Sequence, residues 1–265
     1  MLLTGSDAIV VGEGKGETPL ALNNVDALPT GDFTIEAVVL LESLYADATV
    51  RTIAAHWDAN TQHPGWALGV TSTKSAFTPR NLIMQFVGTD KEGKLQYEVV
   101  PSGLHLELGK PYYIACSVKL DGTGEQEVTF YVQDIAAEND NLRVAQMPHK
   151  VVAGIHNADP LLIGGRAKSD RHRWHGLIDE VRLTNAALSQ DELLPIAATD
   201  NLEQASVPNG KIVGYWTFDQ ADNRLTDTTG QGEPLLPLDQ PIQSEAPWTD
   251  FCHVLLNSNE FLYLD

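Results

Sequence analysis

The stretch that decides the fold is Gly176-Leu-Ile-Asp-Glu-Val-Arg-Leu-Thr184, followed by Asn185-Ala-Ala-Leu-Ser-Gln-Asp-Glu-Leu193. The first part predicts a β-strand and the second a short capped helix. Side chains alternate between the two faces of a strand, so Leu177, Asp179, Val181 and Leu183 are predicted to share one face. Asp179 is then a carboxylate in an apolar row, and it needs either backbone amides or a cation as its partner.

Length and charge bound the class of protein. With 265 residues, 43% of them hydrophobic, the chain can form one large β-sandwich with an appendage or two small domains, and we favour one. The formal charge of -19 at pH 7 repels phosphate, so neither nucleic acid nor a membrane surface is expected as a partner. An acidic chain favours cation binding, although a solvated acidic surface produces the same composition.

The two cysteines indicate no metal or haem centre. Cys116 and Cys252 lie far apart, in no CxxC or CxxCH arrangement, which argues against a zinc knuckle and against covalent haem in this chain. A single disulfide between them stays open. No apolar run approaches the ~20 residues of a membrane span, and Met1-Leu-Leu-Thr4 does not begin a signal peptide. We expect a soluble protein whose compartment the residues alone do not state.

Turn signals separate a series of short apolar strands, with little helix between them. The predicted strands are 33–41, 52–57, 65–70, 82–87, 112–118, 128–132 and 161–165. The loop 58–64 joins the second and third as a hairpin with a long connection. Strands at this spacing predict an all-β fold with two antiparallel sheets, a sandwich or jelly roll.

Four of these segments, in order, resemble the laminin-G-like, concanavalin A-like lectin modules, and we assign residues 1–200 to such a domain. The segments are Phe33-Thr-Ile-Glu-Ala37, Gly65-Trp-Ala-Leu-Gly69, Leu162-Ile-Gly-Gly-Arg166 and Ile178-Asp-Glu-Val181. The resemblance implies two curved antiparallel sheets, frequently a calcium ion at the rim, and a carbohydrate or protein ligand. It also implies an extracytoplasmic location.

Beyond residue 200 the chain changes character. Gly214-Tyr-Trp-Thr-Phe-Asp219 is similar to the first strand of the same module. It either begins a truncated second copy or folds back into the first sandwich. We favour the second interpretation and assign 201–247 to an extension that supplies a strand.

The last segment, 248–265, predicts a short amphipathic helix. It resembles the C-terminus of large planctomycete-type proteins in which a cytochrome-c-like haem domain is joined to two domains of unknown function, sometimes with a laminin-G-like insert. This resemblance implies that the chain belongs to a larger protein.

The sequence predicts no catalytic residue. A glucanase of this fold needs a Glu-x-Asp-x-x-Glu strand with its carboxylates on one face. The nearest match begins at Glu36, but Val38 stands where the aspartate belongs and Leu41 where the last glutamate belongs. Asp179 and Glu180 are adjacent and are predicted to point to opposite faces. We therefore expect no enzyme, with a divergent glycoside hydrolase as the least favoured alternative.

Asp179 is the predicted metal ligand, because Ca²⁺ would neutralise an inward carboxylate at the rim of a sandwich. The alternative is that Asp179 accepts backbone N–H bonds and orders a loop. Asp7, Asp58 and Asp227 are candidate additional ligands without diagnostic spacing. A histidine metal site from His56 and His63 is a weaker option.

Basic and aromatic side chains gather in one loop, Arg166-Ala-Lys-Ser-Asp-Arg-His-Arg-Trp-His175. Arg and Trp suit recognition of a sugar ring by stacking, or of sulfate or carboxylate by forked hydrogen bonds. The predicted ligand-binding residues are Arg171, Arg173, Trp174 and His175, with Trp57 from the 56–66 loop. The alternatives are a solvated loop with Trp174 in the sandwich edge, and a core position for Trp57.

Three functional classes follow. The favoured one is a noncatalytic carbohydrate-binding, lectin-like module of a larger polysaccharide-associated protein, with calcium as a candidate cofactor. The second is a protein-interaction or spacer module without a small ligand. The third is the divergent glycosidase.

Overall fold

The structure, a computed structural model, describes residues 8–11, 18–44, 48–120, 127–137, 141–194, 212–219 and 223–238. These residues form two antiparallel β-sheets. Sheet A consists of β1 (Ile9–Val11), β3 (Phe33–Leu41), β8 (Pro111–Lys119), β9 (Glu127–Asp134), β10 (Arg143–Pro148), β12 (Gly176–Thr184) and β13 (Ile212–Trp216). Sheet B consists of β2 (Leu20–Leu22), β4 (Val50–His56), β5 (Gly65–Thr71), β6 (Asn81–Thr89), β7 (Leu95–His105), β11 (Leu161–Ile163) and β14 (Leu236–Pro237).

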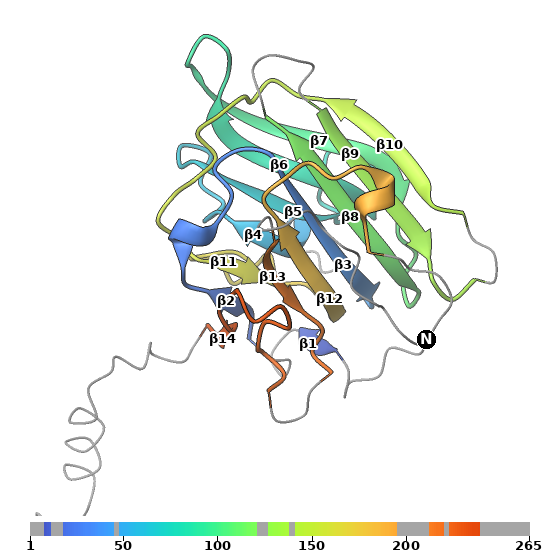
Figure 1. Ribbon diagram of the computed structural model, residues 1–265. Helices are drawn as coiled ribbons and strands as arrows, with labels where there is room; N and C mark the ends of the chain where they lie inside the picture. The colour runs from blue at the N-terminus through green and yellow to red at the C-terminus, as the bar shows by residue number, and fades with distance from the viewer. Residues whose placement is uncertain are drawn as a thin grey trace, which may run out of the picture.

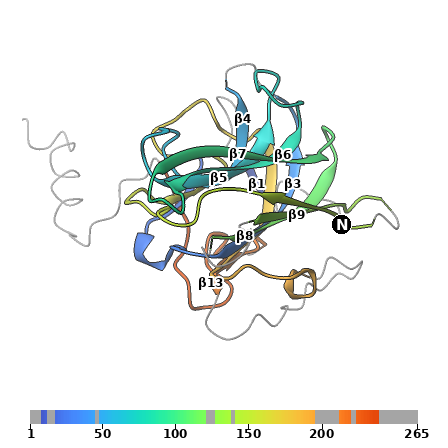
Figure 2. The same ribbon diagram turned by 90° about the horizontal axis from the view of Figure 1, so that it is seen from above.

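The two sheets pack face to face as a sandwich (Figure 1), and Figure 2 shows β5 and β7 in one layer with β8 and β13 in the other. Sheet A has the order β1-β12-β3-β8-β9-β10, and sheet B the order β14-β2-β11-β4-β5-β6-β7. Two 3₁₀ turns, η1 (Val25–Ala27) and η2 (Gln190–Glu192), interrupt the strands. The predicted all-β fold with two antiparallel sheets is confirmed.

Strand alternation divides each sheet between a core face and an outer face. In β6, Met84 and Phe86 belong to the main core cluster, so Gln85 between them points outward. Across the sandwich, the rings of Phe33 and Trp66 lie 4.7 Å apart. A core built this way buries the apolar half of every central strand, which is the main favourable contribution to folding.

Strand β12 contains a β-bulge at its acidic pair. Asp179 lies opposite Val38, and Arg182 lies opposite Glu36. Between these two pairs β12 therefore has one residue more than β3. Glu180 accommodates the extra residue with a φ of 51°, in the left-handed region that non-glycine residues seldom adopt. The bulge shifts by one residue the alternation of side chains between the two faces of the strand.

This bulge overturns the predicted face of β12. Ile178 points into the core before the bulge, whereas Val181 and Leu183 point into it afterwards. Asp179 lies on the outer side of sheet A instead of sharing their face. The prediction of a single alternating row is wrong because it assumes an unbroken period of two.

The outer face of sheet A is covered by the segment that follows β12. Leu188, Leu193 and Leu194 form a second apolar cluster with Tyr113 and other residues of the sheet. Ser189 and Glu192 make a capping box around η2, which Figure 2 shows outside the layer. The predicted capped helix is therefore a single 3₁₀ turn.

Strands β1 and β13 share one edge of β12. β1 pairs with residues 176–178 and β13 with residues 181–184. The segment beyond residue 200 thus supplies a strand of sheet A. The predicted tail helix, 248–265, lies outside the described residues. Within the described part of the chain, no helix is long and apolar enough to cross a membrane.

Candidate functional site

The outer face of sheet B carries aromatic and polar side chains that the core does not use. Gln85 points outward from β6, and Tyr97 of β7 lies opposite the outward residue Val87. Trp57 follows β4 directly and packs against Val87 in the same outer cluster. Rings and hydrogen-bonding groups are therefore combined on one surface, which we call the B-face: Thr52, Trp57, Gln85, Tyr97 and Arg166.

Arg166 lies across the middle of the B-face. Its Nε donates to Thr52 Oγ1 at 2.7 Å, and its Nη2 donates to Gln85 Oε1 at 2.5 Å. The guanidinium carbon lies 5.1 Å from the centre of the Trp57 ring, within cation–π range. Burial lowers the pKa of Arg166 to about 9, with a further lowering from Arg51 and an opposing effect of Tyr97. The side chain is still protonated at neutral pH.

Tyr97 is the exposed member of the B-face. The residue is 45% exposed, although it lies opposite the fully buried Val87 of β6. Its hydroxyl accepts a hydrogen bond from Gln85 Nε2 at 2.8 Å, and its ring centre lies 5.9 Å from that of Trp57. Gln85 therefore bridges Tyr97 and Arg166, and it fixes the relative positions of the ring and the cation.

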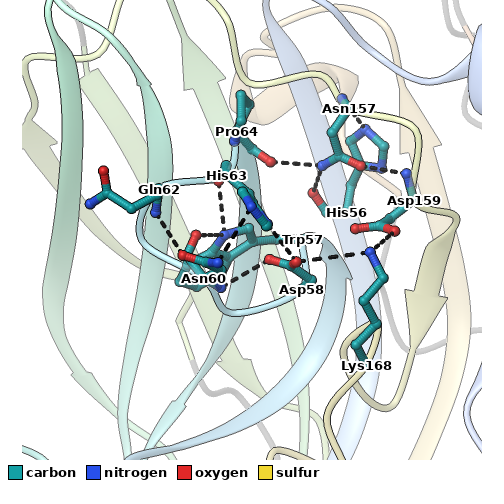
Figure 3. A network of polar contacts seen from close by, with 10 residues as sticks. All are labelled: His56, Trp57, Asp58, Asn60, Gln62, His63, Pro64, Asn157, Asp159 and Lys168. Atoms are coloured by element: carbon teal, nitrogen blue, oxygen red, sulfur yellow. Dashed lines mark hydrogen bonds and ion pairs between the residues drawn. The ribbon is translucent and has the colours of Figure 1, made fainter.

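The loop between β4 and β5 forms one side of the rim of the B-face (Figure 3). Trp57 Nε1 donates to the carbonyl oxygens of Asn60 and His63, at 2.9 and 3.1 Å. Asp58 accepts from the Asn60 backbone N–H at 2.9 Å and contacts His63 Nδ1 at 2.7 Å. The two hydrogen bonds of the indole N–H fix the ring of Trp57 next to the Arg166 guanidinium. Trp57 therefore serves as the floor of the site.

Two further loops are tied to the first. Asn157 Nδ2 donates to the backbone oxygens of His56 and Pro64, at 2.9 and 2.8 Å. Lys168 Nζ lies 2.7 Å from Asp159 Oδ1 and 3.9 Å from Asp58 Oδ2, which Figure 3 shows from close by. The rim thus combines the loops 57–64, 156–160 and 164–171.

The ionisable groups of the rim have different charge states. Burial opposes ionisation of Asp58, but its hydrogen bonds with His63 and Asn60 outweigh this and lower its pKa. Burial, reinforced by His156, lowers the pKa of His56 to about 4. Asp58 is thus an anion at neutral pH, and His56 is a neutral ring.

The predicted ligand loop divides between core and surface. Trp174 is fully buried in the main core, and its indole N–H lies 3.2 Å from the oxygens of both Leu40 and Leu177. The prediction that Trp174 contacts a ligand is therefore wrong, because the ring fills the space between the sheets. Arg171 is exposed, and Arg173 is half-buried with its backbone oxygen 3.2 Å from Arg51 Nη1.

His175 and Trp57 are also less available to a ligand than predicted. His175 Nδ1 contacts Ser43 Oγ at 2.5 Å, and its Nε2 lies 3.5 Å from Glu42 Oε2. The ring therefore lies where β3 ends and β12 begins. Trp57 is 1% exposed. Of the predicted residues, only Trp57 belongs to the B-face, and it supports Arg166 instead of touching solvent.

The predicted metal ligand Asp179 is fully buried on the outer face of sheet A. Its Oδ1 accepts from the backbone N–H of Glu180 at 2.9 Å. This contact agrees with the alternative in which Asp179 orders the backbone, here at the bulge. The expectation of an inward carboxylate is wrong because of that bulge.

Other candidate metal ligands also have protein partners. Asp227 accepts from the backbone N–H of Tyr215 at 2.7 Å and of Gly232 at 2.8 Å, which orders a turn. Asp7 lies outside the described residues. Among the residues that are described, no three His, Cys, Asp or Glu side chains converge as a metal site would require. Calcium binding stays a prediction.

Glu36 and Arg182 form a buried ion pair behind η2. Arg182 Nε lies 2.5 Å from Glu36 Oε2, and both side chains are at most 1% exposed. Glu36 Oε1 also accepts from Tyr113 Oη at 2.6 Å and from Leu194 N at 2.7 Å. Three hydrogen bonds from protein donors hold this carboxylate in place, so Glu36 serves as a structural anchor.

Sequence reasoning missed the central members of the B-face. Arg166 stands at the start of the basic loop, whereas the predicted ligand-binding residues of that loop are Arg171, Arg173, Trp174 and His175. Gln85 and Tyr97 carry no motif. Their signal is positional: Gln85 interrupts the apolar run of β6, and Tyr97 alternates with polar residues on β7. Only the pairing of β6 with β7 brings the two side chains together.

Comparisons with known proteins identify the family. Residues 14–194 match the family model Laminin_G_3, described as the concanavalin A-like lectin/glucanases superfamily. The chain therefore belongs to this superfamily, whose name covers both lectins and glucanases. No curated protein sequence matches the chain.

Solved structures share the fold at low sequence identity. One is the carbohydrate-binding module CBM40 of the Ruminococcus gnavus IT-sialidase bound to α2,3-sialyllactose, with a TM-score of 0.50 and 17% identity over 73% of this chain and 96% of that one. Another is the enzymatically active domain of tailspike protein 2 of bacteriophage CBA120, with a TM-score of 0.51 and 12% identity. That match covers 79% of this chain and 29% of the tailspike chain, so this chain spans less than a third of it.

Proposed function

We propose that this protein is a noncatalytic carbohydrate-binding module whose binding surface is the B-face. The observation that carries the proposal is the pairing of an exposed ring with fixed polar groups. Tyr97 is 45% exposed, and Gln85 holds its hydroxyl while also holding Arg166. Tyr97 stands on β7, the edge strand of sheet B, where its ring is open to a ligand on one side and contacts Trp57 on the other.

The chemistry of the B-face fits a sugar. A pyranose ring has an apolar face of C–H groups and an edge of hydroxyls, so it needs an aromatic surface flanked by hydrogen-bonding groups. Tyr97 offers the ring and its hydroxyl, and Arg166 offers the N–H donors that Thr52 and Gln85 do not occupy. Because Trp57 and the tied rim loops hold these groups in place, little ordering is needed on binding.

The comparisons support the proposal at the level of fold. The CBM40 module of similar fold is described with sialyllactose bound. The tailspike domain is described as enzymatically active, and a fold alone does not decide between the two activities. We infer a binding module because the buried carboxylates of sheet A, Glu36, Asp179 and Glu180, accept hydrogen bonds from the protein itself.

A glycan array tests this proposal, with the purified chain applied in calcium and again in chelator. Specific binding to a set of related glycans is expected, and the chelator arm measures whether calcium takes part. A folded protein that binds no glycan would contradict the proposal. It would favour the alternative of a protein-interaction module.

Variants of Tyr97 locate the surface. Tyr97→Ala should weaken binding at least tenfold, because it removes the stacking ring. Tyr97→Phe keeps the ring and should retain most of the affinity. Phe77→Ala is the matched control, since Phe77 is an exposed aromatic residue, 36% exposed, in the loop at the opposite end of β5. Equal loss in Tyr97→Ala and Phe77→Ala would show that the B-face is not the site.

A further inference from the structure

We infer that Arg166 is the receptor for a carboxylate, and that the ligand of the B-face is an acidic sugar of the uronic or sialic acid class. The inference rests on the proposed function, because it names the chemical class bound at the same surface. It comes from the charge balance around Arg166, which differs from that around the equally buried Arg182.

Among the residues that the structure describes, Arg166 is a buried cation without a counter-charge. The residue is 2% exposed, and its two hydrogen-bond partners, Thr52 and Gln85, are neutral. Within the described residues it makes no ion pair. Burying a charge without an opposite charge is costly, and charged side chains are seldom fully buried unless they are paired.

Arg182 provides the internal comparison. It is as deeply buried as Arg166, at 1% exposure, but it has Glu36 at 2.5 Å as its counter-ion. At Arg182 the fold therefore supplies a carboxylate as counter-ion. At Arg166 it supplies neutral oxygens and an aromatic ring, which orient the guanidinium without neutralising it.

The guanidinium retains donors for a ligand. Nε and one N–H of Nη2 are occupied by Thr52 and Gln85, whereas no protein oxygen in the described part of the chain accepts from Nη1. Nη1 is also not among the fully enclosed polar atoms. The Nη1–Nη2 edge of this largely enclosed side chain has the spacing of the two oxygens of a planar carboxylate and could bind them in a forked arrangement.

The neighbours of Arg166 agree with this polarity. Tyr97, the exposed ring, is bridged to Arg166 through Gln85, so a sugar stacked on Tyr97 would hold its substituent near the guanidinium. The rim carboxylates Asp58 and Asp159 are both engaged by Lys168, which reduces their repulsion of an anion. The chain as a whole carries -19, so an acidic ligand must be selected by this local arrangement.

Matched ligand pairs test the inference in the unaltered protein. The pairs are sialyllactose against lactose, and oligogalacturonate against its methyl ester, measured by calorimetry alongside the array. The acidic member of at least one pair should bind at least tenfold more tightly than its neutral partner. Equal affinities, binding of neutral glycans alone, or binding of sulfated glycans alone would overturn the inference while leaving the proposed function standing. Absence of all glycan binding would overturn both.

The variant Arg166→Gln separates recognition from folding. It should reduce affinity for the acidic glycan at least tenfold and leave that for the neutral partner within about twofold. Arg143→Gln is the control, because Arg143 lies over Tyr112 on sheet A and its loss also removes one charge and one cation–π contact. Retained acidic preference in folded Arg166→Gln would overturn the inference. If Arg166→Gln does not fold, the ligand pairs in the unaltered protein decide.

Discussion

Glu36→Gln is the most informative perturbation of the fold, because it changes one buried carboxylate to an amide of the same shape. Glu36 accepts three hydrogen bonds: from Arg182 Nε at 2.5 Å, from Tyr113 Oη at 2.6 Å and from Leu194 N at 2.7 Å. The amide oxygen can keep only part of this set, and the amide nitrogen must face a donor. Arg182 then becomes a buried cation without its counter-ion.

The expected loss of unfolding free energy follows from these contacts. Removing one partner of a buried ion pair costs about 3–5 kcal/mol, and hydrogen bonds to charged groups contribute about 1.5–3 kcal/mol each. Since the contributions are not additive, we expect a loss of about 3–5 kcal/mol in total. For a chain of this size that corresponds to a fall in melting temperature of roughly 6–20 °C.

Urea unfolding, followed by circular dichroism, measures the change. Glu107→Gln is the control, because Glu107 is exposed and its contact with Lys110 at 2.8 Å lies in solvent. That variant should leave the urea midpoint unchanged. If Glu36→Gln shifts the midpoint no more than Glu107→Gln, the buried pair does not anchor η2 to sheet A and the reasoning fails.

Two further predictions concern the acidic bulge. Burial raises the pKa of Glu180 from 4.5 to about 7, against the opposing hydrogen bond from Tyr215, so the folded state binds this proton more tightly than the unfolded chain. Stability should therefore fall as the pH rises from 4.5 to 7, by about 3 kcal/mol for this group. Glu180→Gln should remove that decline in urea midpoints between pH 4.5 and 8, and an unchanged decline would refute the assignment. For Asp179, calcium binding predicts that chelator lowers the melting temperature and that Asp179→Asn abolishes this response; a melting temperature indifferent to chelator contradicts the calcium prediction.

Much of the fold could be predicted because its signals are local. The strands 33–41, 65–70 and 82–87 are apolar runs bounded by turns, and the structure has β3, β5 and β6 over nearly the same residues. Gly176, which opens the decisive stretch, has a φ of 141°, and a Cβ there would lie 1.9 Å from Leu40 O. A glycine at that point is thus a requirement of the fold that the sequence displays directly.

The bulge in β12 could not be predicted, because it depends on pairing. Alternation places Asp179 with Val181, and nothing in the local pattern shows that Glu180 adopts a φ of 51°. The register with β3 reveals it, since Asp179 faces Val38 and Arg182 faces Glu36. A period of two fails wherever a strand inserts one residue.

The candidate site was the part least visible in the sequence. The basic loop 166–175 was found by composition, but composition does not distinguish Trp174, which fills the core, from Arg166, which crosses the B-face. Gln85 and Tyr97 acquire their role only from neighbouring strands and a loop distant in sequence. Such a site is assembled by tertiary contacts, and the identity of single residues does not predict it.

The most direct test of the B-face is an NMR titration of the indole N–H groups with a glycan that the chain binds. Trp57 lies beneath Arg166, whereas Trp174 and Trp216 are fully buried in the main core between the sheets. The account predicts that the Trp57 resonance shifts with glycan concentration while those of Trp174 and Trp216 stay in place. Saturable binding that leaves the Trp57 resonance unmoved would contradict it.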